Sequence, residues 1–132
     1  MKTIPYARQW IDEKDIEAVV EVLRSDIVTR GNKTREFEEK LCEYTGAEYC
    51  VAVSSGTAAL HLAALVLTEN IKNQNIITTP ISFVATANAI LHSGNKTVFA
   101  DIEEKTPNID PYKVKVLSEG SVGLIGVDMA GH

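Results

Sequence analysis

The sequence predicts an α/β fold with a largely parallel sheet. Short apolar runs alternate with longer segments whose apolar residues recur at helical spacing, and this alternation is typical of parallel strands joined by crossover helices. The 132 residues, 45% of them hydrophobic, are enough for one domain or for part of a larger one. There is no low-complexity tract, linker or internal repeat.

Two amphipathic helices precede the first predicted strand. The first begins at Asp12, a suitable N-cap. It carries an apolar stripe at positions i, i+3, i+4 and i+7, formed by Ile16, Val19, Val20 and Leu23. The second covers about residues 34–44 and ends before Gly46, a natural helix stop.

Four strands are predicted after the second helix, over residues 49–53, 76–79, 97–100 and 122–127. The first is a continuous apolar run, as expected for a strand buried on both faces. The helix that follows it, over about residues 58–65, is apolar almost all round and is therefore predicted to be buried. Two further helices are expected, one over residues 82–92 and a short one opened by Asp110 and Pro111.

Charge and hydropathy exclude several classes of partner. Thirteen basic residues against eighteen acidic ones give a net charge of -5, and nothing supplies the basic face of a nucleic-acid-binding domain. The acidic balance also argues against an anionic membrane surface. The N-terminus lacks the apolar core of a signal peptide. We therefore expect a cytoplasmic protein without nucleic-acid or membrane partners.

The cysteines and histidines carry no recognisable chemistry. Cys42 and Cys50 are separated by eight positions, which matches no zinc or redox signature, and we interpret both as small buried hydrophobes. The three histidines show no metal-ligand spacing. No metal site is predicted.

The turn between the first predicted strand and its helix is the most informative short stretch. Residues 54–57 read SSGT, and a phosphate binds well at a helix N-terminus, where backbone N–H groups are unpaired. A glycine lets the backbone approach such an anion closely. Alternatively Ser55 or Thr57 only caps the helix, since Ser and Thr are common caps. The turn matches neither the dinucleotide nor the P-loop fingerprint.

Together with a second motif, this turn resembles a known family. Residues 54–60 (SSGTAAL) and 79–88 (TPISFVATAN) are similar to motifs of the DegT/StrS-type sugar aminotransferases. The resemblance runs the whole length and includes residues 28–31, 98–101 and 127–131. It implies a pyridoxal 5′-phosphate enzyme of fold type I. The TTPISFVATAN string and the closing VDMAG look most like the pseudaminic-acid-pathway transaminases, which act on a UDP-linked 4-keto-6-deoxy-N-acetylhexosamine.

The resemblance also implies roles for individual residues. Ser55, Gly56 and Thr57 would hold the cofactor phosphate, and the ring of Phe83 would stack on the pyridine ring. Alternatively Phe83 is a core residue of an amphipathic helix. Asp128 follows the last strand and either contacts substrate or cofactor or caps the next element. The family's sugar-nucleotide contacts correspond to Tyr6, Thr29 and Arg30, although exposed turn arginines are common.

No residue of this chain matches the Schiff-base lysine of the family, which we expect beyond His132. The chain also stops directly after a strand that would normally need a covering helix. We therefore expect residues 1–132 to be the N-terminal part of the large cofactor-binding domain, inactive alone, without the rest of that domain and the small C-terminal domain. The full enzyme would be a homodimer that moves an amino group, from glutamate, to a nucleotide-linked 4-keto-6-deoxyhexose.

Two other functions remain open on the sequence. The chain is alternatively a truncated or split-gene interaction domain, for which cofactor absorbance of the purified chain is the discriminating observation. It is otherwise a Rossmann-like nucleotide-binding module. Nucleotide binding without pyridoxal phosphate would favour that module, although no glycine-rich fingerprint follows any predicted strand.

Overall fold

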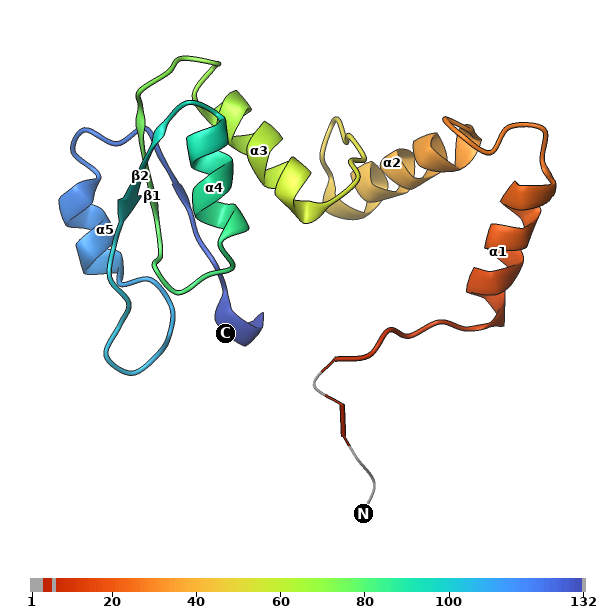
Figure 1. Ribbon diagram of the computed structural model, residues 1–132, viewed down its shortest axis with the longest axis horizontal. Helices are drawn as coiled ribbons and strands as arrows, with labels where there is room; N and C mark the ends of the chain where they lie inside the picture. The colour runs from red at the N-terminus through yellow and green to blue at the C-terminus, as the bar shows by residue number, and fades with distance from the viewer. Residues whose placement is uncertain (1–3, 6, 132) are drawn as a thin grey trace. The chain divides into compact units, whose positions relative to one another are not determined.

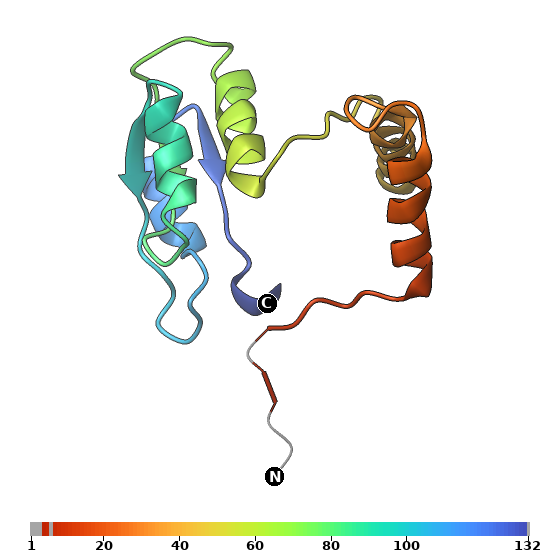
Figure 2. The same ribbon diagram turned by 45° about the vertical axis from the view of Figure 1, so that its right-hand side comes forward.

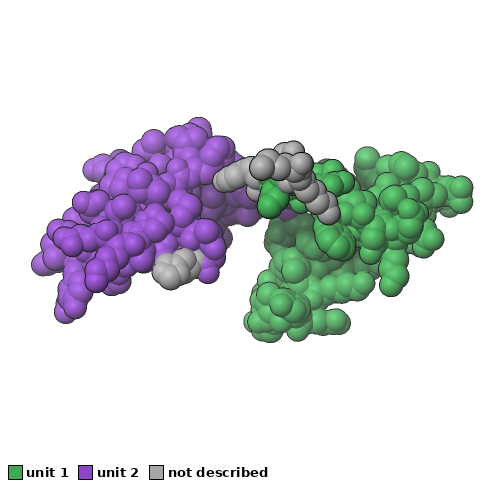
Figure 3. Space-filling model, turned by 90° about the horizontal axis from the view of Figure 1, so that it is seen from below, with its two compact units in different colours: residues 1–52 green, residues 53–132 purple. Residues whose placement is uncertain are grey.

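The computed structural model describes residues 4–5 and 7–131. The chain divides into two compact units, residues 1–52 and residues 53–132, which Figure 3 distinguishes by colour. The first is helical and the second contains the sheet.

The first unit contains α1 (Glu13–Arg24) and α2 (Asn32–Thr45). The predicted N-cap of α1 is confirmed. The Asp12 carboxylate accepts from the amides of Lys14 at 2.9 Å and Asp15 at 3.2 Å, and the Asp15 carboxylate accepts from the Asp12 amide at 2.9 Å, which completes a capping box. Gly46 ends α2 with φ 75°, in the left-handed region that favours glycine at this position.

The second unit is built around a three-stranded sheet (Figure 1). Its strands are β1 (Asn75–Thr78), β2 (Lys96–Phe99) and β3 (Gly123–Ile125), in the order β2-β1-β3. Both pairings are parallel, with Ile77 opposite Val98 and Leu124. The prediction of a parallel sheet is confirmed.

Helices cover both faces of this sheet. Helices α3 (Gly56–Leu67) and α4 (Ala85–His92) pack against each other on one face, and α5 (Pro111–Leu117) lies on the other (Figures 1 and 2). The predicted cap and first-turn proline of α5 are confirmed, because the Asp110 carboxylate accepts from the Tyr112 amide at 2.8 Å. The core cluster joins α3, β1 and α4 through Ala64, Ile76 and Ile90, with Ile125 of β3 against it.

The predicted strand at residues 49–53 is wrong. This segment has no strand pairing, and the side chains of Tyr49 and Val51 are 80% and 71% exposed. A strand requires a neighbour for its ladder, and the described sheet ends at β2 and β3. The amide of Ala52 instead donates to the Glu38 carboxylate of α2 at 2.7 Å.

Three other expectations need correction. Helix α3 is not buried all round, because packing on one side shields one stripe and Ala64 is its single buried residue. Helix α4 begins at Ala85 rather than at Ser82, since residues 79–84 form the turn that leads from β1 onto the sheet face. Cys42 and Cys50 are half-buried free thiols rather than core residues.

Candidate active site

The carboxyl ends of the three strands meet at one edge of the sheet, because all are parallel. Ligands of open α/β sheets bind outside this edge. The segments that leave it carry Phe83, after β1, and Asp128, after β3. Helix α3 precedes β1 and packs beside α4, so its first turn lies at the same end of the unit. The order of the elements thus places five of the predicted residues at the same end of the second unit, namely Ser55, Gly56, Thr57, Phe83 and Asp128.

Ser55 is the N-cap of α3. Its backbone is extended, and its hydroxyl oxygen accepts from the amide of Ala58 at 3.1 Å. Ser55 therefore caps the helix, and this bond leaves its hydroxyl proton free to reach an acceptor outside the helix. Gly56 and Thr57 are the first two helical residues, and within the described chain their amides donate to no acceptor.

The space in front of this helix end is open. A Cβ added to Gly56 would meet no atom within 4 Å, and Thr57 is exposed. The start of this 12-residue helix thus combines two unpaired amides, two exposed hydroxyl residues and the positive end of the helix dipole with open space beside Gly56. These groups fit a phosphate monoester, which needs several N–H or O–H donors and open space for its three oxygens.

Phe83 is not a core residue. Its side chain is 77% exposed, and it lies in the turn before α4 rather than on the helix. The packing interpretation is wrong because α4 begins two residues later, so that Phe83 falls outside its buried stripe. That stripe consists of Ala85, Thr86, Ala89 and Ile90. An aromatic face exposed at the ligand edge of the sheet is free to stack on a planar ring.

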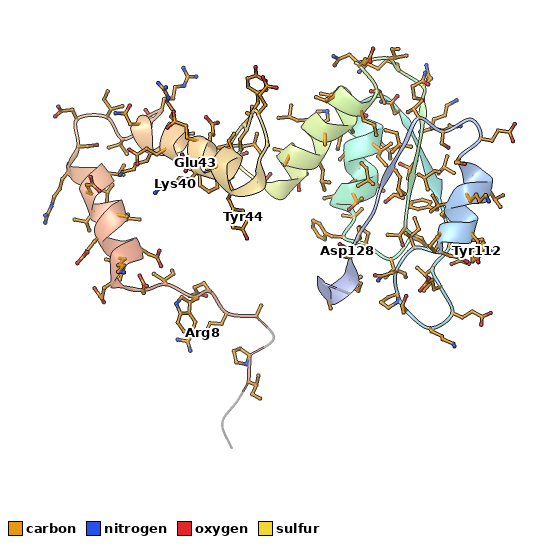
Figure 4. The ribbon with its side chains drawn as sticks, turned by 180° about the vertical axis from the view of Figure 1, so that it is seen from behind. Arg8, Lys40, Glu43, Tyr44, Tyr112 and Asp128 are labelled. Carbon is orange, nitrogen blue, oxygen red and sulfur yellow. The ribbon has the colours of Figure 1, made fainter. Side chains whose placement is uncertain are left out.

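Asp128 lies between β3 and the short 3-10 turn Met129–Gly131 (Figure 4). Its side chain is exposed, and within the described residues its carboxylate has no protein partner. Its backbone carbonyl, not its side chain, accepts from the Gly131 amide at 3.1 Å. The side chain therefore caps no described element. The amide of Met129 donates to Asn108 Oδ1 at 3.0 Å, which ties the segment to the loop after β2.

The other predicted contacts belong to the first unit. Thr29 is exposed, and Arg30 lines a hollow of about 380 Å³ between α1 and α2. Lys33 lines it too, 3.1 Å from Glu36 and 3.6 Å from Glu21. The hydrogen bond to Glu36, with the charge of Glu21, raises the pKa of Lys33. Arg30 has no such acidic partner within the described chain. Tyr6 lies outside the described residues.

Sequence reasoning gave no role to two hydroxyl residues that flank Phe83. The Ser82 hydroxyl lies 2.7 Å from Thr86 Oγ1 and 3.0 Å from the Phe83 carbonyl oxygen, to which it donates. The spacing of four residues between Ser82 and Thr86 was the available signal, although Ser82 lies in the turn before α4 and only Thr86 lies in the helix.

Other chemistries find little support in the described part of the chain. Residues 4–5 and 7–131 contain no group of three or more His, Cys, Asp or Glu side chains arranged to hold a metal ion. None of the helices described is both long and apolar enough to cross a membrane.

The chain is similar to known sugar aminotransferases. Residues 9–132 match the model of the DegT/DnrJ/EryC1/StrS aminotransferase family. The UDP-4-amino-4,6-dideoxy-N-acetyl-beta-L-altrosamine transaminase of Campylobacter jejuni is 43% identical over 98% of this chain and 35% of that protein. The structure of Helicobacter pylori PseC, an aminotransferase of pseudaminic-acid biosynthesis, superposes with a TM-score of 0.85 and 40% identity over 98% of this chain and 35% of that one.

A third similar protein is the sugar aminotransferase Spr1654 of Streptococcus pneumoniae, solved in its PLP form. Its structure superposes with a TM-score of 0.85 and 33% sequence identity, and the match covers 98% of this chain and 33% of Spr1654. The present chain thus spans about a third of the length of the relatives that it matches. The match takes in both motifs at residues 54–60 and 79–88. The chain belongs to the DegT/DnrJ/EryC1/StrS aminotransferase family, whose cofactor is pyridoxal 5′-phosphate.

Proposed function

We propose that residues 1–132 form the N-terminal part of the large domain of a pyridoxal-phosphate-dependent sugar aminotransferase. The observation that carries the proposal is the open N-terminus of α3, where the amides of Gly56 and Thr57 are unpaired and no atom lies within 4 Å of a Cβ placed on Gly56. The family match makes the phosphate of the cofactor the natural ligand of these donors.

Each residue of the region has a role in this proposal. The amides of Gly56 and Thr57 and the hydroxyls of Ser55 and Thr57 bind the phosphate. The ring of Phe83 orients the cofactor and excludes water from one of its faces. Asp128 contacts the substrate or a polar group of the cofactor. The cofactor, when bound, would supply an aldehyde carbon to which the amino group is transferred and a ring that accepts electrons.

The proposed substrate is a nucleotide-linked 4-keto-6-deoxyhexose, with glutamate as amino donor. Two relatives that act in amino-sugar biosynthesis support this substrate class. Arg30 supports it as well, because a guanidinium without an acidic partner suits the diphosphate of a nucleotide sugar. We further propose that the full-length protein is a cytoplasmic homodimer in which each cofactor site is completed by the partner chain.

The Gly56→Val variant tests the phosphate site in the full-length protein that contains this chain. The added side chain would fill the open space and displace the phosphate, and we expect affinity for pyridoxal phosphate to fall about thirtyfold, equivalent to ~2 kcal/mol. Glu13→Val is the control, because it places the same residue at the first position of α1. Native cofactor affinity in a folded Gly56→Val protein would reduce residues 55–57 to an ordinary helix cap.

The position of the reactive lysine is tested on the 132-residue chain itself. Nine lysines are present, and we expect borohydride reduction with pyridoxal phosphate to give no site-specific adduct on any of them. A stoichiometric adduct on one lysine, located by mass spectrometry, would place the reactive lysine within this chain. Binding of a nucleotide without any affinity for pyridoxal phosphate would instead favour a nucleotide-binding module.

A further inference from the structure

Phe83 combines an exposed ring with a firmly held backbone. Its ring is 77% exposed, yet its carbonyl oxygen accepts two hydrogen bonds, from the Thr86 amide at 3.1 Å and from the Ser82 hydroxyl at 3.0 Å. An exposed side chain on a surface turn is ordinarily mobile. Here the main chain that carries it is fixed on both sides.

The turn is anchored to buried side chains at both ends. Thr79 follows β1, is 2% exposed, and accepts from the Ile81 amide at 3.2 Å. Thr86 lies in the first turn of α4, is 5% exposed, and is 2.7 Å from the Ser82 hydroxyl. Ser82 itself is half-buried. The six residues between β1 and α4 are therefore tied to the sheet and to the helix that cover the core.

Helix capping does not account for the Ser82 hydroxyl. A capping side chain accepts from the unpaired amides of a helix start, whereas Ser82 donates its single proton to the Phe83 carbonyl oxygen, and its oxygen lies 2.7 Å from the Thr86 hydroxyl. The N-cap of α4 is Val84, which has no side-chain cap. The bonds of Ser82 thus fix the turn that carries Phe83 rather than satisfy the amides of α4.

We infer that Ser82 is a positioning residue, which holds the ring of Phe83 in the plane that stacks on the cofactor. This inference rests on the proposed function, because it assumes that Phe83 faces the pyridine ring. Stacking requires a ring at a set height and tilt, and a backbone fixed in advance loses less freedom when the ligand binds. Thr86 serves the same purpose through its hydroxyl, which is 2.7 Å from the Ser82 oxygen.

A tryptophan reporter in the full-length protein tests the inference. The chain contains a single tryptophan, Trp10, so that Trp10→Phe with Phe83→Trp leaves residue 83 as the only indole of residues 1–132. We expect added pyridoxal phosphate to quench this indole strongly. Adding Ser82→Ala should leave the ring unaligned, lower the quenching at saturation, and weaken cofactor binding about fivefold, the equivalent of one net hydrogen bond.

Two controls separate positioning from general stability. Ser82→Thr keeps the hydroxyl and should restore both quenching and affinity. Ser118→Ala removes a comparable bond, from a hydroxyl to the Lys115 carbonyl at 2.7 Å, at the end of α5 on the opposite face of the sheet. It should change neither readout. Thr86→Val, which removes the hydroxyl at nearly constant volume, should reproduce the effect of Ser82→Ala.

The outcomes distinguish the inference from the proposed function. Cofactor binding without any quenching of the indole, with Ser82 intact, would overturn the stacking role of Phe83 and the inference with it. Strong quenching that Ser82→Ala and Thr86→Val leave unchanged would overturn the positioning role alone. Loss of folding in both variants would also overturn it, because the hydroxyl pair would then be a requirement of the fold.

Discussion

The two units of the chain are stabilised in different ways. None of the described residues of unit 1 is fully buried, and its helices are held by signals within a few positions of each end, the capping box at Asp12 and the left-handed Gly46. Unit 2 depends on contacts that are distant in sequence, such as the Thr78 hydroxyl, which donates to the Ile125 carbonyl 47 residues away. Local signals suffice for helices, whereas a parallel sheet needs partners from remote segments.

The largest contrast is expected from the same substitution in each unit. Ile76 of β1 is fully buried, and Ile76→Ala should lower the free energy of unfolding by about 2–5 kcal/mol, through lost burial and the cavity left behind. Ile16 of α1 is 47% exposed, and Ile16→Ala should change the free energy of unfolding by less than about 0.5 kcal/mol. Urea denaturation of the full-length protein measures both. Equal effects would mean that the α1 stripe is covered in solution.

A smaller effect should follow from one added carbon in β3. A Cβ on Gly123 would lie 2.5 Å from the Leu67 side chain of α3, and Gly123→Ala should destabilise unit 2 by about 1–3 kcal/mol through overpacking. Gly126→Ala is the matched control, because a Cβ there meets nothing within 4 Å. If both variants have the same thermal stability, the helix and the strand are not closely packed at this point.

Loss of a helix cap should lower the free energy of unfolding by less than the overpacking at Gly123 does. Asp12→Ala removes the acceptor of two amides at the start of α1, and we expect a loss of about 1 kcal/mol, seen as fraying of residues 13–16 in hydrogen exchange. Because a cap acts only on its own helix end, Asp110→Ala should lower the stability of α5 by a similar free energy. A much larger loss for Asp12 alone would show that α1 is coupled to other parts of the protein.

The smallest expected effect on stability comes from the charge of Lys33, which interacts with Glu36 of α2 and Glu21 of α1. Its pKa is raised by the hydrogen bond to Glu36 and by Glu21. The stabilisation is therefore present below the ordinary lysine pKa and is lost as the pH rises through the higher folded-state pKa. In NMR titrations, Glu36→Gln should lower the pKa of Lys33 more than Glu21→Gln does. The reverse order would show that the ion pair between the helices is the stronger interaction.

The comparison also explains which parts of the fold were predictable. The caps of α1 and α5 and the stop at Gly46 were predicted because each depends on one residue at the helix end, a capping aspartate or a glycine in the left-handed conformation. Strands β1, β2 and β3 were predicted from apolar runs near their true positions. Residues 49–53 have the same pattern but no strand beside them, so the prediction failed there. Composition indicates that a segment suits a strand but not whether a neighbour is present.

The candidate site was predictable to a similar extent. The residues of the α3 turn and Phe83 came from motifs, and the parallel order of the strands brings them to one edge. The sequence did not indicate that Phe83 lies outside α4, because the segment from Ser82 onward reads as a continuous helix. It also did not reveal the bonds of Ser82, since these depend on where α4 begins. The binding roles of all the predicted site residues stay predictions, namely those of Ser55, Gly56, Thr57, Phe83, Tyr6, Thr29, Arg30 and Asp128.

The central place of β1 also sets an order of events during synthesis. β1 and β2 leave the ribosome close together, but Ile125 follows Thr78 by 47 residues. At about 5–20 residues per second, one side of β1 stays without its partner for roughly 2–9 s. Throughout that interval the nascent chain presents an unpaired strand edge with Ile76 and Ile77 beside it, the kind of surface that chaperones shield.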